Sequence, residues 1–79
     1  LRDVYKRQHQ GIGQALINRI EAWALNHHIR RIEATVVTEN INAIELFKGM
    51  GFQIEGELKD KLFINQKYYN EYVMAKILN

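Results

Sequence analysis

Apolar and polar residues alternate along the chain with two different periods, and each change of period marks the boundary of a predicted element. From Gly11 or Ile12 to about His27, apolar residues recur every three or four positions, as on one face of a helix. The apolar face comprises Ala15, Leu16, Ile20, Trp23 and Ala24, continues towards His27, and is widened by Ile17. Such a face predicts packing against a sheet, with Trp23 in the core.

A strand is predicted directly after this helix. Ile29–Val37 is short and rich in β-branched residues. Side chains alternate between the two faces of a strand, so Ile32, Ala34 and Val36 share one face. A helix that leads straight into a strand is typical of helices layered on a sheet, and the pattern therefore predicts an α/β fold.

A second helix is predicted from about Ile41 to Met50. Asn40 precedes it, and an asparagine oxygen can accept a hydrogen bond from the first turn of a helix. Gly51 follows it, at the position where a left-handed residue commonly ends a helix. The apolar stripe of this helix is Ala43, Ile44, Phe47 and Met50.

The rest of the chain predicts two more strands. Phe52–Leu58 alternates, and Gly56 within it is a candidate bulge. The segment 59–63 has no clear pattern and is expected to be a connection. Ile64–Lys67 is expected to form a hairpin turn before the alternating strand Tyr68–Leu78. The predicted α/β (α+β) order is loop, helix, strand, helix, strand, strand.

The stretch Gln8–Leu16 contains two glycines, Gly11 and Gly13, just before the first predicted helix. Glycine tolerates unusual dihedrals and lets a ligand approach the backbone closely. The first turn of a helix has unpaired N–H groups and a partial positive charge, which suit a phosphate. We therefore predict an anion-binding loop after an irregular segment over residues 1–7, although a tight turn without a ligand would use the same glycines.

Composition excludes several function classes. The 79 residues are 47% hydrophobic and 25% charged, as in one small globular domain. The net charge of +2 is too small to favour a nucleic-acid partner, and no apolar run reaches the roughly 18 residues of a membrane span. The absence of cysteine excludes disulfides and a cysteine nucleophile. A cytoplasmic location is the default expectation.

The histidines do not predict a metal site. His27 and His28 are adjacent, so their side chains diverge on a helix, and His9 is the remaining imidazole. Cations are instead favourable at the C-terminus of a helix, which is where the pair lies. We expect no bound metal.

Two motifs resemble signatures of the GNAT superfamily of N-acetyltransferases. The first, Gln8-x-x-Gly11-x-Gly13, is similar to the family's Arg/Gln-x-x-Gly-x-Gly/Ala. The second resembles Asn-x-x-Ala-x-x-Leu-Tyr followed by Gly-Phe, and here it is Asn40-x-x-Ala43-x-x-Leu46-Phe47 followed by Gly51-Phe52. Their order and separation also match, and the C-terminal part resembles amine and amino-acid acetyltransferases, including the spermidine type.

This resemblance implies a partial GNAT fold with a mixed sheet and its N-terminal strands missing, which binds acetyl-CoA and no metal. Backbone N–H groups of about Gln10–Gln14 would hold the pyrophosphate. Asn40 would hydrogen-bond the pantetheine arm, cap its helix, or do both. The arm would lie between two splayed strands, one of them at residues 32–37. The implied coenzyme-binding residues are Gln8, His9, Gln10, Gly11, Ile12, Gly13, Gln14, Asn40, Ala43 and Phe47.

The implied reaction transfers the acetyl group directly to a primary amine of a small molecule such as a polyamine or an amino acid. A neutral amine would attack the thioester, and the thiolate of CoA would leave. Where the family usually has a tyrosine that protonates this thiolate, the chain has Phe47, which has no proton to give. Tyr68, Tyr69 and Tyr72 are alternatives that packing on a sheet also explains, so the catalytic residues are not identified.

The resemblance runs from Gln8 to the C-terminus, the second half of a family domain. We therefore expect residues 1–79 to form a single truncated domain in which residues 1–7 include non-native sequence. Glu33 and Glu39 flank the expected cleft, although a solvent-facing position also explains Glu33. Two alternatives remain, a non-catalytic module that binds CoA or phosphate and a structural fragment without a ligand. The family often dimerises, but no residue specifies a homodimer, and no membrane or nucleic-acid partner is indicated.

Overall fold

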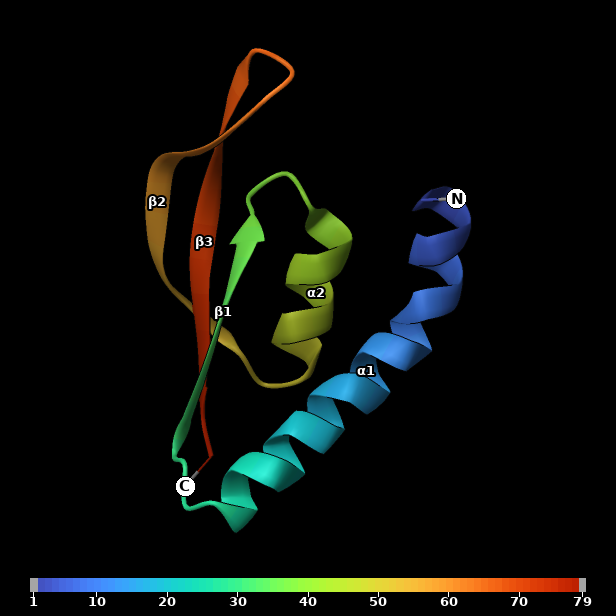
Figure 1. Ribbon diagram of the computed structural model, residues 1–79, viewed down its shortest axis with the longest axis vertical. Coiled ribbons are helices and arrows are strands. Elements are labelled where there is room, and N and C mark those ends of the chain that lie inside the picture. The colour runs from blue at the N-terminus through green and yellow to red at the C-terminus, as the bar shows by residue number, and fades with distance from the viewer. Residues whose placement is uncertain (1, 79) are drawn as a thin grey trace.

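The computed structural model describes the backbone of residues 2–78 and the side chains of residues 13–78. This part of the chain forms two helices and three strands, in the predicted order from the first helix onward (Figure 1). The elements are α1 (Arg2–Asn26), β1 (Arg31–Val37), α2 (Ile41–Gly49), β2 (Gln53–Ile64) and β3 (Lys67–Ile77). The prediction of an α/β fold is therefore confirmed.

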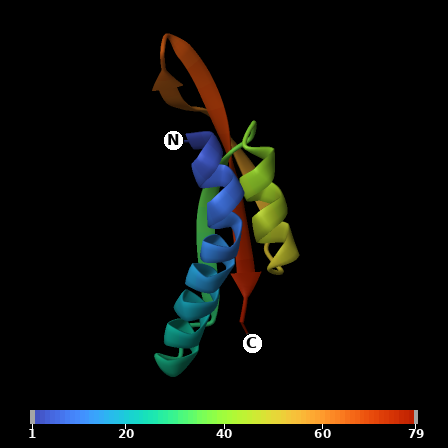
Figure 2. The same cartoon turned by 90° about the vertical axis from the view of Figure 1, so that its right-hand side faces the viewer.

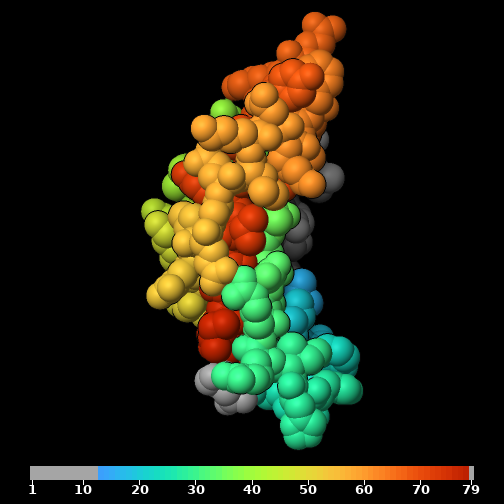
Figure 3. Space-filling view, turned by 90° about the vertical axis from the view of Figure 1, so that its left-hand side faces the viewer, coloured from blue at the N-terminus to red at the C-terminus, as the bar shows by residue number. Residues whose placement is uncertain are grey.

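The three strands form one sheet in the order β1-β3-β2, with antiparallel pairing on both sides of β3. Both helices lie on the same side of this sheet, and the view from that side shows them in front of the strands (Figure 1, Figure 2). The opposite side, which we call the open face, has no helix over it in the described part of the chain (Figure 3). Among the described residues, β1 pairs with β3 alone, so its other side is an edge of the sheet.

The core lies between the helices and the sheet. Met74, in the middle of β3, is fully buried. Ile17 of α1, Val36 of β1, Ile44 of α2 and Phe52 are buried around it. Val36 lies in the core and Ile32 packs against it, which agrees with the prediction that they share one face of β1. The predicted apolar stripe of α2 is confirmed as well, since each of its residues belongs to this cluster or packs against it.

The second strand, β2, is longer than predicted. The register shifts between Ile54 and Gly56, which confirms the bulge expected at Gly56. The segment 59–63 was predicted to be a connection, and this was wrong, because it continues β2 up to the hairpin. The hairpin turns at Asn65 and Gln66, whose φ angles are 51° and 63°, so the predicted turn is confirmed.

A side chain from the neighbouring strand holds the irregular part of β2 in the sheet. The side-chain oxygen of Asn70 accepts a hydrogen bond from the backbone N–H of Asp60 at 2.8 Å. The side-chain nitrogen of Asn70 donates to the carboxylate of Glu57 at 2.7 Å. These bonds join residues ten and thirteen positions apart, so no local sequence pattern predicts them.

The prediction for the N-terminal segment was wrong. Helix α1 begins at Arg2, so residues 2–7 are helical rather than irregular, and Gly11 and Gly13 lie inside the helix rather than in a loop. Residue 1 lies outside the described part. Arg, Lys and Gln, which are good helix formers, recur before the glycines, and each glycine weakens a helix by only about 1 kcal/mol. The helix propensity of the neighbouring residues therefore outweighs the two glycines, and the helix continues past both.

Helix α1 also packs through a different face from the predicted one. Leu16, Ile20 and Trp23 are 56%, 44% and 55% exposed, so the prediction that Trp23 lies in the core was wrong. Of the predicted face, Ala24 and the adjoining Ile17 are buried. The helix therefore contacts the rest of the molecule along one flank of its apolar stripe rather than along the centre.

Two contacts set this orientation. A Cβ atom on Gly13 would lie 3.0 Å from Cδ2 of Leu46, so the missing side chain allows α1 and α2 to approach closely. Two turns further along α1, the carboxylate of Glu21 pairs with the Nζ of Lys76 on β3 at 2.9 Å. Residues 13, 17, 21 and 24 lie on one face of a helix, because they are three or four positions apart. This face, not the most apolar one, is the contact surface of α1.

A pair of glycine substitutions tests the helix contact. Alanine favours a helix by up to about 1 kcal/mol over glycine at either position. A Cβ on Gly49 would have no neighbour within 4 Å, whereas one on Gly13 would press on Leu46. We expect Gly49→Ala to raise the free energy of unfolding, and Gly13→Ala to lower it by about 1 kcal/mol, because overpacking outweighs propensity. Urea unfolding measures both, and equal stabilisation by the two variants would contradict the contact.

Candidate functional site

The turn between β1 and α2 places Asn40 at the N-terminus of α2. Its side-chain oxygen accepts a hydrogen bond from the backbone N–H of Ala43 at 3.2 Å, so the predicted cap is confirmed. The turn is fixed to β3 by the N–H of Thr38, which donates to the carbonyl of Asn70 at 3.0 Å. It is fixed to β1 by the N–H of Asn40, which donates to the carbonyl of Val37 at 2.9 Å. The position of Asn40 is therefore determined by two strands and a helix.

The side chain of Asn40 has a second polar group. Its amide nitrogen donates no hydrogen bond within the described residues, and the residue is exposed. A primary amide has two N–H donors besides its accepting oxygen. Asn40 can therefore cap α2 with its oxygen and donate to a ligand with its nitrogen, beside the partial positive charge of the helix N-terminus.

Ala43 and Phe47 lie on the side of α2 that faces the core. Both are half-buried and pack against the core cluster. The ring of Phe47 meets the ring of Phe52 edge to face, with 5.0 Å between centroids and 72° between planes. This packing explains why an aromatic residue without a hydroxyl group is suitable at position 47. Ala43 and Phe47 can therefore offer a ligand only apolar contacts.

The glycine stretch does not form an open anion site in this conformation. The side chains of residues 8–12 lie outside the described part, and Gln14 is exposed. The backbone N–H groups of residues 10–14 lie within a continuous helix, where each donates to the carbonyl four residues earlier. A pyrophosphate could use these groups only if α1 began near Gly11.

Helix α2 connects the two sequence motifs. Asn40 caps its N-terminus, and Gly13 approaches Leu46 further along it. Residues far apart in the sequence are thereby brought to one helix on one side of the sheet. The structure therefore brings the two motifs together, because residues of both contact α2.

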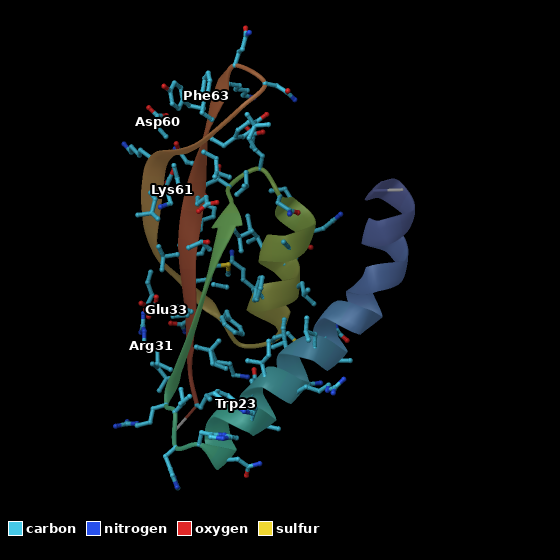
Figure 4. The ribbon with its side chains drawn as sticks, in the orientation of Figure 1. Trp23, Arg31, Glu33, Asp60, Lys61 and Phe63 are labelled. Carbon is cyan, nitrogen blue, oxygen red and sulfur yellow. The ribbon has the colours of Figure 1, made fainter. Side chains whose placement is uncertain are left out.

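The two carboxylates that flank the expected cleft, Glu33 and Glu39, are already paired. Arg31 donates to Glu33 at 2.8 Å and also to Glu55, and Arg31 and Glu33 extend from the open face (Figure 4). The hydrogen bond from Arg31 holds the pKa of Glu55 below its ordinary value and raises that of Arg31. Glu39 pairs with Lys67 at 3.5 Å. Both Glu33 and Glu39 are exposed, so the solvent-facing position predicted for Glu33 is confirmed.

The tyrosines considered as proton donors all have packing partners. Tyr68 lies against Phe63 near the tip of the β2–β3 hairpin, with 4.7 Å between ring centroids (Figure 4). The Nζ of Lys67 lies 5.1 Å from the centroid of the Tyr69 ring. Tyr72 packs against the core cluster. Packing therefore explains each of them, and none is singled out as an acid.

The sequence patterns did not single out Glu71, although it is the most notable acidic residue of the sheet. It is 9% exposed and is the buried charged side chain among the described residues. The alternating pattern placed Glu71 on one face of its strand. The pattern did not indicate that Glu71 is buried, because its burial depends on side chains of the two neighbouring strands.

The described residues contain no group of three or more His, Cys, Asp or Glu side chains that could hold a metal ion. None of the helices in this part of the chain has the length and apolar character that crossing a membrane requires.

Comparison with known proteins gives consistent matches. The family described as acetyltransferase (GNAT) domain matches residues 4–73. The L-amino acid N-acetyltransferase AaaT of Escherichia coli (strain K12) is 34% identical over 71 residues, which are 89% of this chain and 44% of that protein. The chain therefore spans less than half the length of this curated relative.

Solved structures agree with this result. A GNAT-family acetyltransferase from Streptococcus pneumoniae has a TM-score of 0.80 at 33% identity, over 85% of this chain and 41% of that one. The spermidine/spermine N-acetyltransferase SpeG from Vibrio cholerae has a TM-score of 0.83 at 30% identity, over 90% of this chain and 42% of that one. The two helices and three strands thus correspond to part of a larger fold.

Two substitutions at the cap test its contribution to stability. Asn40→Ala removes the oxygen that accepts from Ala43, and we expect it to lower the free energy of unfolding by about 1 kcal/mol. Asn40→Asp retains an accepting oxygen at a position where the two residues cap equally well, so we expect a change of less than about 0.5 kcal/mol. Thermal or urea unfolding distinguishes them, and equal losses in both variants would contradict the capping role.

Proposed function

Because the chain belongs to the GNAT acetyltransferase family, we propose that it is the acetyl-CoA-binding part of an enzyme that acetylates a primary amine of a small molecule. The family match over residues 4–73 supports this proposal, since that range contains both sequence motifs. The observation that carries the coenzyme assignment is the geometry of Asn40, whose oxygen caps α2 while its amide nitrogen is left for a ligand.

The pantetheine arm would run along the free edge of β1. An edge strand presents unpaired N–H and C=O groups, and an extended ligand with amide groups can pair with them as an added strand would. Asn40 follows this edge by three residues, at the turn that leads into α2. Its amide nitrogen would donate to a carbonyl of the arm. The implied contacts of Ala43 and Phe47 would be apolar ones.

The pyrophosphate would bind where α1 is interrupted by its glycines. We propose that α1 begins at Gly11 when the coenzyme binds, so that the N–H groups of residues 10–14 become free to donate. A helix is weakest at glycine, and the positive end of the shortened helix would then face the anion. The side chains of Gln8, His9, Gln10 and Gln14 would border that site.

The reaction would be a direct transfer. The lone pair of a neutral amine forms a bond to the thioester carbonyl carbon, the C–S bond breaks, and the amine loses a proton while the CoA thiolate gains one. Phe47 cannot supply that proton, so water or a tyrosine would do so. Loss of general acid help typically slows a reaction by about 10²- to 10⁴-fold, which reduces turnover without preventing it.

The acceptor class is proposed from the relatives. AaaT is named for L-amino acids, and SpeG is named for spermidine and spermine. Both kinds of acceptor carry a primary amine on a small molecule. We therefore propose an amino acid or a polyamine as the acceptor of the parent enzyme.

One observation favours a second candidate function, a module that binds CoA without catalysis. The side chain at position 47 is a phenylalanine that packs on Phe52 and has no exchangeable proton. A chain that retained the coenzyme-binding residues but lacked the catalytic groups, the acid among them, would bind acetyl-CoA and leave it intact.

Calorimetry with acetyl-CoA tests the coenzyme assignment on the 79-residue chain. We expect binding by the wild-type chain and about 3- to 10-fold weaker binding by Asn40→Asp, which retains the cap and loses the N–H donors. Asn42→Asp is the matched control, because it adds the same charge at an exposed position in the first turn of α2. It should bind within about twofold of the wild type, since no donor is lost.

The same samples separate the two functions when amino acids and polyamines are added and release of the free CoA thiol is followed. Thiol release identifies the transferase, and binding without release identifies the module. Absence of acetyl-CoA binding by the folded wild-type chain, or equal binding by Asn40→Asp and Asn42→Asp, would contradict the role of Asn40.

A further inference from the structure

Glu71 lies at the centre of the sheet, at the point where β1 ends. It is in the middle strand β3, directly opposite Val37, the last residue of β1, and opposite Leu58 of β2. The side chains of Met74 and Val36 point into the core, so strand alternation places Glu71 and Val37 on the open face. The carboxylate is therefore flanked by apolar side chains on both sides, close to the turn that carries Asn40.

This carboxylate has no partner among the described side chains. Glu71 is 9% exposed, and within the described part of the chain it accepts no hydrogen bond from a side chain and forms no ion pair. The other glutamates of the sheet and its surroundings differ in this respect. Each of the following accepts a hydrogen bond from a Lys, Arg or Asn side chain: Glu21, Glu33, Glu39, Glu55 and Glu57. Glu45 and Asp60 are exposed to water.

The carboxylate oxygens of Glu71 keep some access to solvent, because every fully buried side-chain oxygen among the described residues has a hydrogen-bond partner. Two cations of the sheet are used elsewhere. Lys67 pairs with Glu39 on the neighbouring turn and lies over the ring of Tyr69, and Arg31 is held by Glu33 and Glu55. The carboxylate of Glu71 is therefore accessible to a cation from outside the described chain, which would pair with it by a charge-assisted hydrogen bond.

We propose that Glu71 binds the ammonium group of the acceptor substrate, and that the acceptor carries this cation on an unbranched alkyl chain. An ammonium group donates up to three hydrogen bonds and matches a single carboxylate. Val37 and Leu58 offer apolar contacts to the methylene groups beside it. The inference rests on the proposed function, since it places the acceptor on the open face at the end of the strand whose edge would hold the pantetheine.

The strand register supports this arrangement. The N–H of Thr38 donates to the carbonyl of Asn70, so the residue before Glu71 is bonded to the turn that positions Asn40. Acceptor and coenzyme would then reach the same end of β1 from two directions, the acceptor across the open face and the coenzyme along the edge. Glu71 would be a binding residue for the acceptor, and Asn40 one for the coenzyme.

The test is a nuclear magnetic resonance titration of the 79-residue chain with propylamine at pH 7, where this probe is a cation, and with 1-propanol as the uncharged counterpart. We expect saturable shifts of the backbone amides around Val37 and Glu71 with propylamine and not with 1-propanol. Glu71→Gln, which has the same size without the charge, should weaken binding on the order of tenfold. Glu71→Asp retains the charge and should bind more tightly than Glu71→Gln.

Glu33→Gln is the matched control, because Glu33 lies on the same open face but is exposed and paired with Arg31. It should bind propylamine within about twofold of the wild type, since its carboxylate already has a cation. Equal binding of propylamine and 1-propanol, or equal binding by Glu71→Gln and the wild type, would overturn the proposal. Acetyl-CoA calorimetry on the same variants should give unchanged affinities. Retained propylamine binding without acetyl-CoA binding would support the Glu71 site and contradict the coenzyme assignment alone.

Discussion

The burial of Met74 under both helices is the packing interaction on which the rest of the structure depends. Met74 lies in the central strand and is fully buried, and one residue from each of four other segments surrounds it. A chain of 79 residues has room for little more than one such cluster. The helices therefore gather on one side of the sheet, and the other side remains the open face.

The single cluster also explains what is left exposed. Helix α1 reaches the core through Ile17, with Gly13 against Leu46 and Glu21 against Lys76 on either side. Small and polar residues thus occupy part of the contact face, and the larger apolar residues of α1 lie beside it in solvent. Outside the core, the hairpin of β2 and β3 extends beyond the helices (Figure 1) and is held by strand pairing, by the hydrogen bonds of Asn70 and by the contact between Phe63 and Tyr68.

Features encoded by neighbouring residues could be predicted from the sequence. Examples are the cap at Asn40, the end of α2 at Gly51 with its φ of 95°, the bulge at Gly56 and the hairpin turn at Asn65. Features that depend on distant residues could not. The face through which α1 packs depends on Leu46 and Lys76, and the length of β2 depends on Asn70.

The residues of the candidate site also differ in whether the sequence could predict them. Asn40 was predictable because its cap and its motif are both local. The burial of Glu71 was not, because Val37 and Leu58 come from strands far away in the sequence. The glycine motif was recognised, but its conformation was predicted wrongly, because helix propensity before Gly11 outweighs the weak helix-breaking effect of two glycines.

The functional account links these features at one place. The edge of β1, the turn at Asn40 and the carboxylate of Glu71 meet where β1 ends, and α2 relates that place to the glycines of α1. The polar groups there are positioned by strands and a helix rather than by a flexible loop. The proposed coenzyme binding would require a change in the first part of α1, which is helical through the glycine motif.

Backbone hydrogen exchange along α1, with and without saturating acetyl-CoA, tests this central claim most directly. If α1 begins at Gly11 on binding, the amides of residues 6–9 lose their helical hydrogen bonds and exchange faster. The amides of residues 10–14 then donate to the pyrophosphate and exchange more slowly. Unchanged exchange along α1 at saturation, or uniform slowing from residue 3 to residue 26, would contradict the account.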